Sequence, residues 1–274
     1  MAAGKVDEMT NRVKWQAHQS SNMEMPENTM AAMRYAWELG GIPELDIRQT
    51  ADGIMIGMHD STPKRTTDAP DFEQDKLISQ CSYEQVKLWD AGIRFSERFQ
   101  GEKVPALSEV LAILAENPER EIYLDYKEVD LTKLAALIRE YGVEQQVIFA
   151  HCDDENCKII KRLAPKIRTM LWISGGGTPE GIAQRFAEAD EAGFADLDMV
   201  QIHLRDQADA DSWRYQVQPD FLRQALSKTS EAGVELEVLI FHFDSQSLYA
   251  LLDMGIRRFA VDEPKRFVET LRHY

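Results

Sequence analysis

The sequence alternates short apolar runs with amphipathic stretches along almost its whole length, and this alternation is the feature that most constrains the fold. Apolar runs predict strands, whereas apolar positions that recur every three or four residues predict helices. One predicted strand starts at 42, and seven others span 13–17, 121–125, 147–150, 168–173, 198–203, 235–241 and 258–261. The first predicted helix starts near 28, and seven others span 107–116, 131–141, 155–163, 179–192, 219–232, 245–254 and 264–272. Eight strand-helix units favour the α/β class and a (β/α)8 barrel, the TIM barrel.

One segment interrupts this alternation. Residues 61–103 are polar and rich in turns, with only short helical pieces such as 82–89. They follow a hairpin in which a turn at 51–53 joins the second strand to a returning arm at 54–58. A long excursion of this kind predicts a functional insertion that caps the barrel mouth. Because 274 residues with 44% hydrophobic content suffice for one barrel core, we expect a single domain over 1–274.

Carboxylates cluster at the second strand of this prediction. Glu44 and Asp46 are two residues apart on a strand, so their side chains share one face. Two carboxylates about 4 Å apart repel by about 4 kcal/mol at an effective dielectric constant near 20, which favours a cation between them. Asp125 ends a neighbouring strand and would supply a third oxygen ligand. The three residues predict a site for one hard divalent cation.

The reactive residues of such barrels lie at the C-terminal ends of the strands. Five of the six histidines fall at predicted strand ends or at the end of the hairpin arm: His18, His59, His151, His203 and His242. We expect His18 and His59 to act as an acid/base pair around a bound phosphodiester. Lys127 projects on the same side as Asp125 and could meet a phosphate oxygen.

The remaining strand-end residues are less decisive. Trp172 is expected to form a wall of the pocket. His203 and His242 either line the pocket and bind substrate or bond to neighbouring backbone, and the sequence leaves both alternatives open.

The charge balance limits the partners. With 47 acidic and 31 basic residues, the formal net charge of −16 argues against nucleic acid and against an anionic membrane surface. A small phosphodiester stays acceptable because a bound cation inverts the local field. The three cysteines form no recognisable disulfide framework, and residues 1–12 contain no apolar run typical of a signal peptide. We therefore expect a cytoplasmic protein, or a periplasmic or secreted one if a signal peptide has been removed.

Several of these motifs resemble those of the glycerophosphodiester phosphodiesterase family of metal-dependent (β/α)8 enzymes. The resemblance rests on Ala17-His18, Pro26-Glu27-Asn28-Thr29, Glu44-Leu45-Asp46, His59-Asp60, Arg65-Thr66-Thr67, Asp90-Ala91-Gly92, the run from Gly101 to Glu109, Asp125-Tyr126-Lys127 and Val261-Asp262-Glu263-Pro264. It implies that Glu44, Asp46 and Asp125 bind one Mg²⁺ or Ca²⁺. It further implies that His18 and His59 are the acid/base pair and that Lys127 contacts the phosphate.

Three residues depart from the family pattern. Gln19 stands where the family has an arginine, Ser20 where it has a glycine, and Asp125 where it has a glutamate. Gln19 is expected to contact substrate, but its amide carries no charge. The resemblance implies hydrolysis of a glycerophosphodiester to glycerol phosphate and an alcohol. The alternatives are a related phosphodiesterase for another headgroup or a sugar phosphodiester, and a catalytically silent binding protein.

Overall fold

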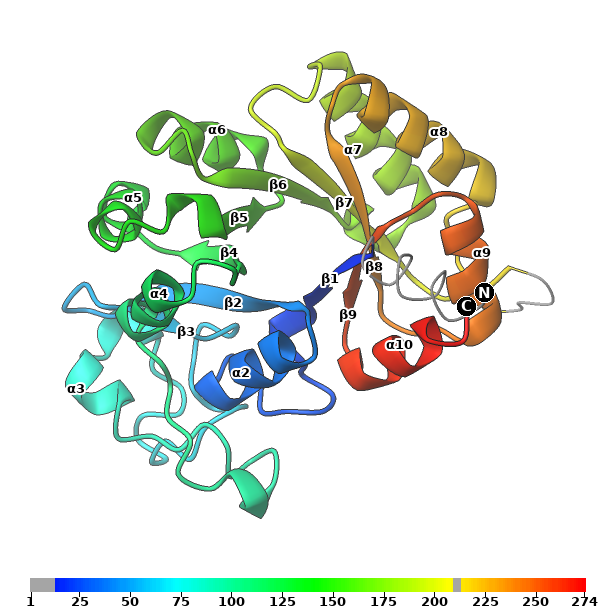
Figure 1. Cartoon of the computed structure of the whole chain (residues 1–274). Coiled ribbons are helices and arrows are strands. Elements are labelled where there is room, and N and C mark those ends of the chain that lie inside the picture. The colour runs from blue at the N-terminus through cyan, green and yellow to red at the C-terminus, as the bar shows by residue number, and fades with distance from the viewer. Residues whose placement is uncertain (1–12, 209–212) are drawn as a thin grey trace.

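The fold is a closed barrel of eight parallel strands surrounded by helices, as the sequence predicts (Figure 1). The computed structural model describes residues 13–208 and 213–274. The prediction made for residues 1–12, that they contain no signal peptide, lies outside the described residues. The sheet order is β1-β9-β8-β7-β6-β5-β4-β2, and pairing of β1 with β2 closes the barrel. The barrel strands are β1 Lys14–Ala17, β2 Ile42–Gln49, β4 Ile122–Glu128, β5 Val147–His151, β6 Arg168–Ile173, β7 Met199–Leu204, β8 Glu235–Ile240 and β9 Arg258–Val261.

Each barrel strand leads to one major helix. These helices are α2 Met30–Glu38, α4 Leu107–Glu116, α5 Leu131–Glu140, α6 Asp154–Leu163, α7 Pro179–Glu191, α8 Pro219–Glu231, α9 Ser245–Asp253 and α10 Pro264–Leu271. Local sequence fixes their starts, because Thr29, Asp130 and Asp244 accept hydrogen bonds from the first-turn N–H groups of α2, α5 and α9. Proline, which needs no N–H partner there, opens α7, α8 and α10.

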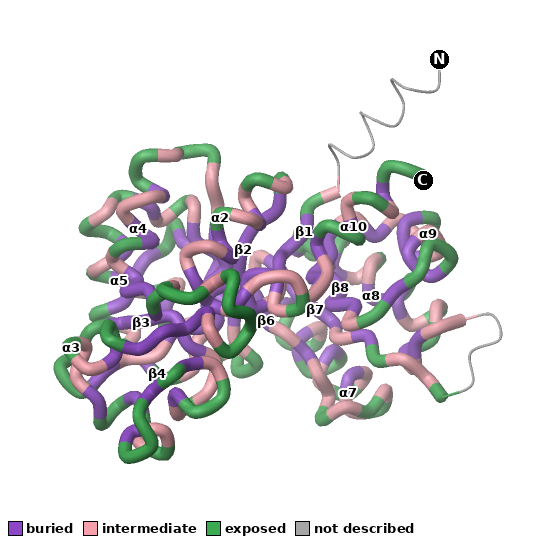
Figure 2. The backbone as a smooth tube through the Cα atoms, turned by 90° about the horizontal axis from the view of Figure 1, so that it is seen from below, coloured by how far each residue is buried: buried purple, intermediate pink, exposed green. Residues whose placement is uncertain are grey.

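The main hydrophobic core lies between the barrel and its helices. It includes Leu45 and Leu124 from the strands together with Leu111 and Ile138 from the helices. Buried residues follow the strands through the centre of the molecule, while exposed residues lie on the outer loops (Figure 2). The barrel therefore forms a rigid frame on which the strand ends can hold side chains.

The predicted hairpin arm is β3 Met55–Gly57, which pairs antiparallel with β2 outside the barrel. The prediction of a helix over 82–89 was too long, because α3 spans only Tyr83–Val86. The Trp89 indole N–H instead donates to Glu73 at 2.9 Å, which ties the end of this segment to another loop.

The insertion packs around a second hydrophobic cluster, which it shares with the hairpin arm and with Val104. Nine buried residues form it: Ile56, Met58, Ala69, Ile78, Cys81, Val86, Trp89, Ala91 and Val104. The segment lies below β2 and β3 in Figure 1. It contacts the loop between β1 and α2 through Arg65, whose guanidinium donates to Glu27 at 2.6 and 2.8 Å. The insertion thus borders the barrel end where the β1 loop lies.

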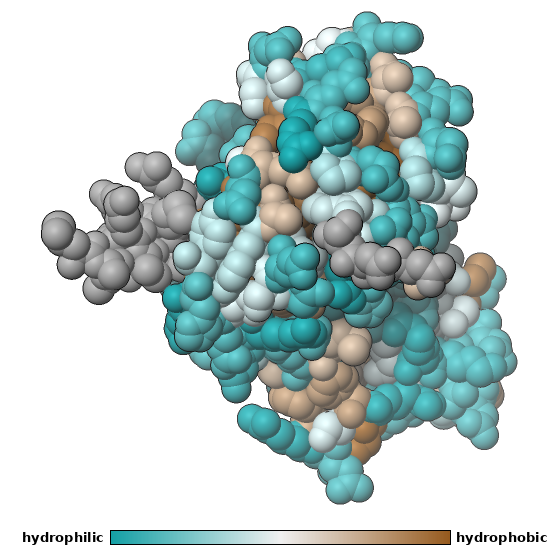
Figure 3. All heavy atoms as spheres, turned by 90° about the vertical axis from the view of Figure 1, so that its right-hand side faces the viewer, coloured by the Kyte–Doolittle hydropathy of each residue, from teal (hydrophilic) through white to brown (hydrophobic). Residues whose placement is uncertain are grey.

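The outer surface is mainly hydrophilic on the face seen in Figure 3, with apolar side chains in small separate groups. Within the described ranges, every helix is too short or too polar to cross a bilayer.

Candidate active site

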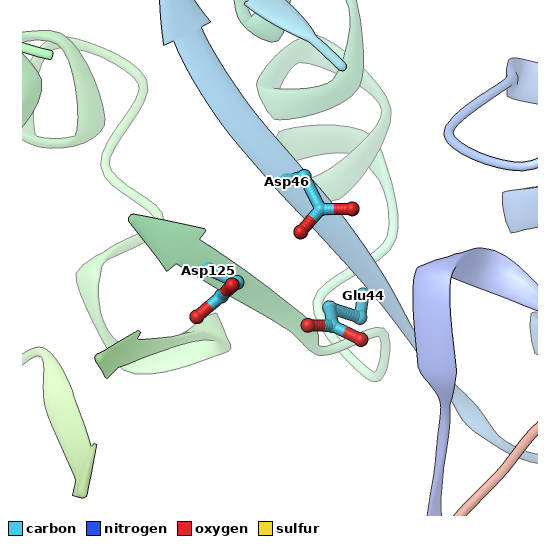
Figure 4. Close-up of side chains that lie close together, drawn as sticks. All are labelled: Glu44, Asp46 and Asp125. Carbon is cyan, nitrogen blue, oxygen red and sulfur yellow. The ribbon is translucent and has the colours of Figure 1, made fainter. Parts of the chain in front are cut away.

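Three carboxylates converge inside the C-terminal end of the barrel. Glu44 and Asp46 lie on β2, and Asp46 pairs in register with Asp125 on β4. Oxygen atoms of the three residues lie within 4.8 Å of one another, and all three side chains are buried. Figure 4 shows them directed into the same space. The two-residue period of the strand and the register of its neighbour therefore produce the predicted cluster.

Two neighbours contact this carboxylate cluster directly. The Lys127 ammonium lies 2.5 Å from the nearer Asp125 oxygen and 3.1 Å from Asp46. The Trp172 indole N–H, from the end of β6, donates to the other Asp125 oxygen at 2.9 Å. The structure thus brings Lys127 and Trp172 to the predicted site.

The three carboxylates differ in their proton affinity. Burial raises the pKa of Asp125 to about 7, even though Lys127 opposes the shift. Burial also raises the pKa of Glu44, against the opposing charge of His18. For Asp46 burial acts in the same sense, but Lys127 and His59 outweigh it and hold the pKa below its usual value. Burial is thus the main reason that two of the three carboxylates bind a proton more readily than usual.

Asn28 holds Asp46 through two hydrogen bonds. Its amide NH₂ donates to the Asp46 carboxylate at 2.7 Å, and its amide oxygen accepts the Asp46 backbone N–H at 2.8 Å. In the sequence Asn28 stood out only as part of the motif Pro26-Glu27-Asn28-Thr29, without a predicted role. Its backbone φ is +56°, a left-handed conformation that asparagine adopts more readily than most residues.

A tight turn joins the end of β1 to Glu44. The turn is the 3₁₀ segment His18–Ser20, and Gln19, Ser20 and Ser21 all have positive φ. The Gln19 backbone N–H donates to the Glu44 carboxylate at 2.9 Å, and the Ser20 hydroxyl donates to the Glu44 carbonyl at 2.5 Å. These two bonds hold the turn against the strand that carries the carboxylates.

His18 lies at the end of β1 and pairs with Asp262, which follows β9. Its Nδ1 lies 2.6 Å from the Asp262 carboxylate. Burial would lower the pKa of His18, but Glu44 and Asp262 outweigh burial and raise it to about 9. In the sequence Asp262 stood out as part of the motif Val261-Asp262-Glu263-Pro264, without an assigned role. Their separation of 244 residues explains why no local pattern could reveal the pairing.

His59 follows β3 and has a carboxylate partner of its own. Its Nδ1 lies 2.8 Å from Asp60, which also accepts from the Arg65 guanidinium at 2.7 and 3.0 Å. Arg65 holds the pKa of Asp60 at about 2, so this carboxylate is charged at neutral pH. A charged carboxylate accepts only, which places the imidazole proton on Nδ1 and leaves Nε2 free.

A row of aromatic rings follows the strand ends around the mouth. Neighbouring ring centroids lie 4.9 to 6.5 Å apart in the order Tyr126, His151, Trp172, His203, Phe241 and His18. His203 stacks on Trp172 at an interplanar angle of 16°, and its Nε2 lies 3.0 Å from the Gln201 amide oxygen. Burial lowers the pKa of His203 to about 3, so this side chain is neutral at physiological pH. Phe241 was missed because it directly follows the end of β8 without any distinctive spacing.

Two predicted contact residues lie less centrally. The Gln19 amide oxygen accepts from the Asn22 amide at 2.9 Å, so part of this side chain is engaged in its own turn. His242 is largely exposed and faces Asp206 at 3.5 Å. None of the described contacts joins His242 to the carboxylate cluster, and substrate roles for both residues stay predictions.

The donor set fits a divalent cation. Three buried carboxylates supply only oxygen ligands, which hard cations such as Mg²⁺ and Ca²⁺ prefer. Burial raises the pKa of Glu44 and of Asp125 because it disfavours the charged carboxylate, and a bound cation would stabilise that charged form. Glu44, Asp46 and Asp125 are therefore the residues that would hold the ion.

Known proteins share this fold. A glycerophosphodiester phosphodiesterase from Agrobacterium tumefaciens has a crystal structure that superposes with a TM-score of 0.73 at 24% identity, covering 94% of this chain and 99% of that one. A phosphodiesterase from Oleispira antarctica in complex with the product sn-glycerol-3-phosphate gives a TM-score of 0.71 at 22% identity, over 96% and 98% of the two chains. Both confirm the predicted TIM barrel.

Sequence comparison extends the likeness beyond the fold. A glycerophosphodiester phosphodiesterase from Caldanaerobacter subterraneus subsp. tengcongensis is 36% identical over 171 residues, which cover 58% of this chain and 66% of that relative. The match thus spans just under two thirds of the relative's length. The model of the glycerophosphoryl diester phosphodiesterase family matches residues 18–265, a range that includes both histidines and all three carboxylates. On this evidence the chain belongs to the glycerophosphoryl diester phosphodiesterase family.

Proposed function

We propose that this chain is a cation-dependent phosphodiesterase that hydrolyses glycerophosphodiesters to glycerol phosphate and an alcohol. The observation that carries the proposal is the buried cluster of Glu44, Asp46 and Asp125 at the end of the barrel. Family membership supports it, as does the product named for the phosphodiesterase from Oleispira antarctica. The substrate is a small molecule, and the cation is one Mg²⁺ or Ca²⁺.

His18 is the proposed general acid. Asp262 accepts from its Nδ1, which leaves Nε2 to meet the substrate. Because its pKa of about 9 keeps the imidazole protonated at neutral pH, His18 can give a proton to the leaving alkoxide oxygen as the bond from phosphorus to that oxygen breaks. Asp262 then stabilises the ring in the orientation required for this transfer.

His59 is the proposed general base. With Nδ1–H held by Asp60, its Nε2 can take a proton from the attacking oxygen as the new bond to phosphorus forms. The attacking group is water or a neighbouring hydroxyl of the glycerol. The proton gained at His59 and the proton lost at His18 balance over the reaction.

The remaining residues bind and orient the substrate. A bound cation would supply positive charge to the phosphoryl oxygens and reduce their repulsion of the nucleophile. Lys127 provides a further cation beside this position, and its charge favours an anionic phosphate oxygen. Trp172 and His203 form a flat stacked wall, and the neutral imidazole suits a hydroxyl group better than a second charge.

Turnover across a panel of phosphodiesters tests the proposal. Glycerophosphocholine, glycerophosphoethanolamine, a lysolipid, a sugar phosphodiester and a cyclic phosphodiester would each be assayed with Mg²⁺, with Ca²⁺ and with a chelator. We expect cation-dependent release of glycerol phosphate from the two glycerophosphodiesters. Preference for the lysolipid or sugar diester would assign another substrate, and cation binding without any turnover would identify a silent binding protein.

We also propose the cytoplasm as the compartment. All three cysteines are free, with Cys81 and Cys157 buried and Cys152 exposed, which suits a reducing environment. Mass spectrometry of thiol-labelled protein from cells would test this assignment.

A further inference from the structure

Arg205 stands directly after β7, at the same end of the barrel as the carboxylate cluster. Its side chain is exposed, and its guanidinium carbon lies 5.5 Å from the centre of the Phe241 ring. An arginine over an aromatic face is held in place by cation–π attraction while its N–H groups stay available. Arg205 therefore presents an oriented cation at the barrel mouth.

Four other cations at this end of the barrel are already engaged. Each has at least one carboxylate partner: Lys127 with Asp46 and Asp125, Arg65 with Glu27 and Asp60, Arg48 with Glu128, and Arg214 with Asp206 and Asp244. Across residues 13–208 and 213–274, the Arg205 guanidinium donates no hydrogen bond and forms no ion pair. A guanidinium that can donate two hydrogen bonds at once, and that has no partner among the described residues, is suited to an anionic ligand.

Arg205 and the proposed acid, His18, both contact the ring of Phe241. The Phe241 ring beneath the guanidinium meets the His18 ring at 6.1 Å and the His203 ring at 5.8 Å, both edge-on. On the other side lies Gly177, where a Cβ would come within 3.6 Å of Arg205 Nε. Arg205 thus lies between Gly177 and an aromatic ring that also contacts the His18 ring.

Gln19 does not supply this charge. Its amide is neutral, and its oxygen is engaged by Asn22. We propose that Arg205 binds a non-bridging phosphate oxygen of the substrate and supplies the guanidinium charge that position 19 lacks. This inference rests on the proposed phosphodiesterase function and adds to it a residue that fixes the phosphate.

The test compares Arg205→Gln and Arg205→Lys with the unmodified protein. The matched control is Arg120→Gln, because Arg120 also lies over an aromatic ring, Trp37 at 4.9 Å, but precedes β4 at the opposite end of the barrel. Calorimetry measures binding of sn-glycerol 3-phosphate and of glycerol in the presence of Mg²⁺. Steady-state assays measure kcat and KM on glycerophosphocholine and on glycerophosphoserine, and thermal unfolding gives Tm.

Loss of a charge-assisted contact should weaken binding of glycerol 3-phosphate by roughly 10-fold or more in Arg205→Gln, with a smaller loss in Arg205→Lys. Binding of glycerol and the Tm should be unchanged, because the side chain is exposed. The catalytic efficiency should fall by similar factors on both diesters. Arg120→Gln should match the unmodified protein in every measurement.

Three results would overturn the proposal. One is unchanged binding of glycerol 3-phosphate in Arg205→Gln, and another is an unmodified protein that does not bind this probe. The third is a loss confined to glycerophosphoserine, which would assign Arg205 to an anionic headgroup. If the unmodified protein binds the probe but cleaves no diester, the proposed function fails, while the binding measurements still decide the role of Arg205.

Discussion

His203 should make the stability of the fold sensitive to acid. Its pKa is about 3 in the folded protein, against 6.5 for an ordinary histidine, because burial disfavours the charged imidazole. Between these two pH values, His203 is therefore protonated in the unfolded chain but neutral in the folded protein. The free energy of unfolding therefore has its full value above pH 6.5 and decreases as the pH falls toward 3.

The size of the effect follows from this difference. Each pH unit between the two pKa values lowers the free energy of unfolding by about 1.4 kcal/mol, so acidification by two units below 6.5 removes about 3 kcal/mol. His203→Gln removes the titrating group while keeping an amide that can donate to Gln201. Its stability should therefore decline less steeply with falling pH than that of the unmodified protein.

Urea unfolding at several pH values, followed by tryptophan fluorescence, would measure both curves. Phe241→Leu is the control, since it changes the ring that packs edge-on against His203 but removes no titrating group. Its curve should run parallel to that of the unmodified protein. Parallel curves for His203→Gln and the unmodified protein would refute the argument, because His203 would then titrate alike in both states and could serve as an acid or base.

Other substitutions test the candidate site. His18→Ala and His59→Ala should each lower kcat by roughly 100-fold or more with an unchanged circular dichroism spectrum, and near-normal turnover would remove that histidine from the mechanism. Asn28→Ala should weaken cation binding by about 10-fold or more in calorimetry, because Asp46 loses the amide that orients it; equal affinity would show that Asn28 serves only the backbone. Gln19→Arg should raise kcat/KM on glycerophosphocholine, with a larger gain when Arg205 is glutamine, and a gain that is independent of residue 205 would contradict a shared phosphate contact.

The barrel and the carboxylate cluster could be predicted because both depend on short periods in the sequence. A strand repeats every two residues, so Glu44 and Asp46 had to share a face, and Lys127 had to follow Asp125 to the same side. The prediction of the third ligand also needed β2 and β4 to be neighbours with Asp46 beside Asp125. The alternation of strands and helices supplied the first condition.

Contacts between distant segments could not be predicted in this way. Asp262 reaches His18 only because β9 lies beside β1 in the closed barrel. The cation–π contact of Arg205 depends in the same way on two loops that follow different strands. Local preferences also overestimated the helix at 82–89, because α3 ends at Val86 and the Trp89 indole N–H donates to Glu73, which is distant in the sequence.

The separate hydrophobic cluster of the insertion affects how this protein can change over evolution. Substitutions on the outer surface of 61–103, where Phe72 and Leu88 are already exposed, alter a module whose interior is largely its own. The barrel core and the carboxylates on β2 and β4 need not repack when the module changes. The outer surface of the insertion can therefore vary while the carboxylates stay in place, as long as Arg65 is kept to hold Asp60 beside His59.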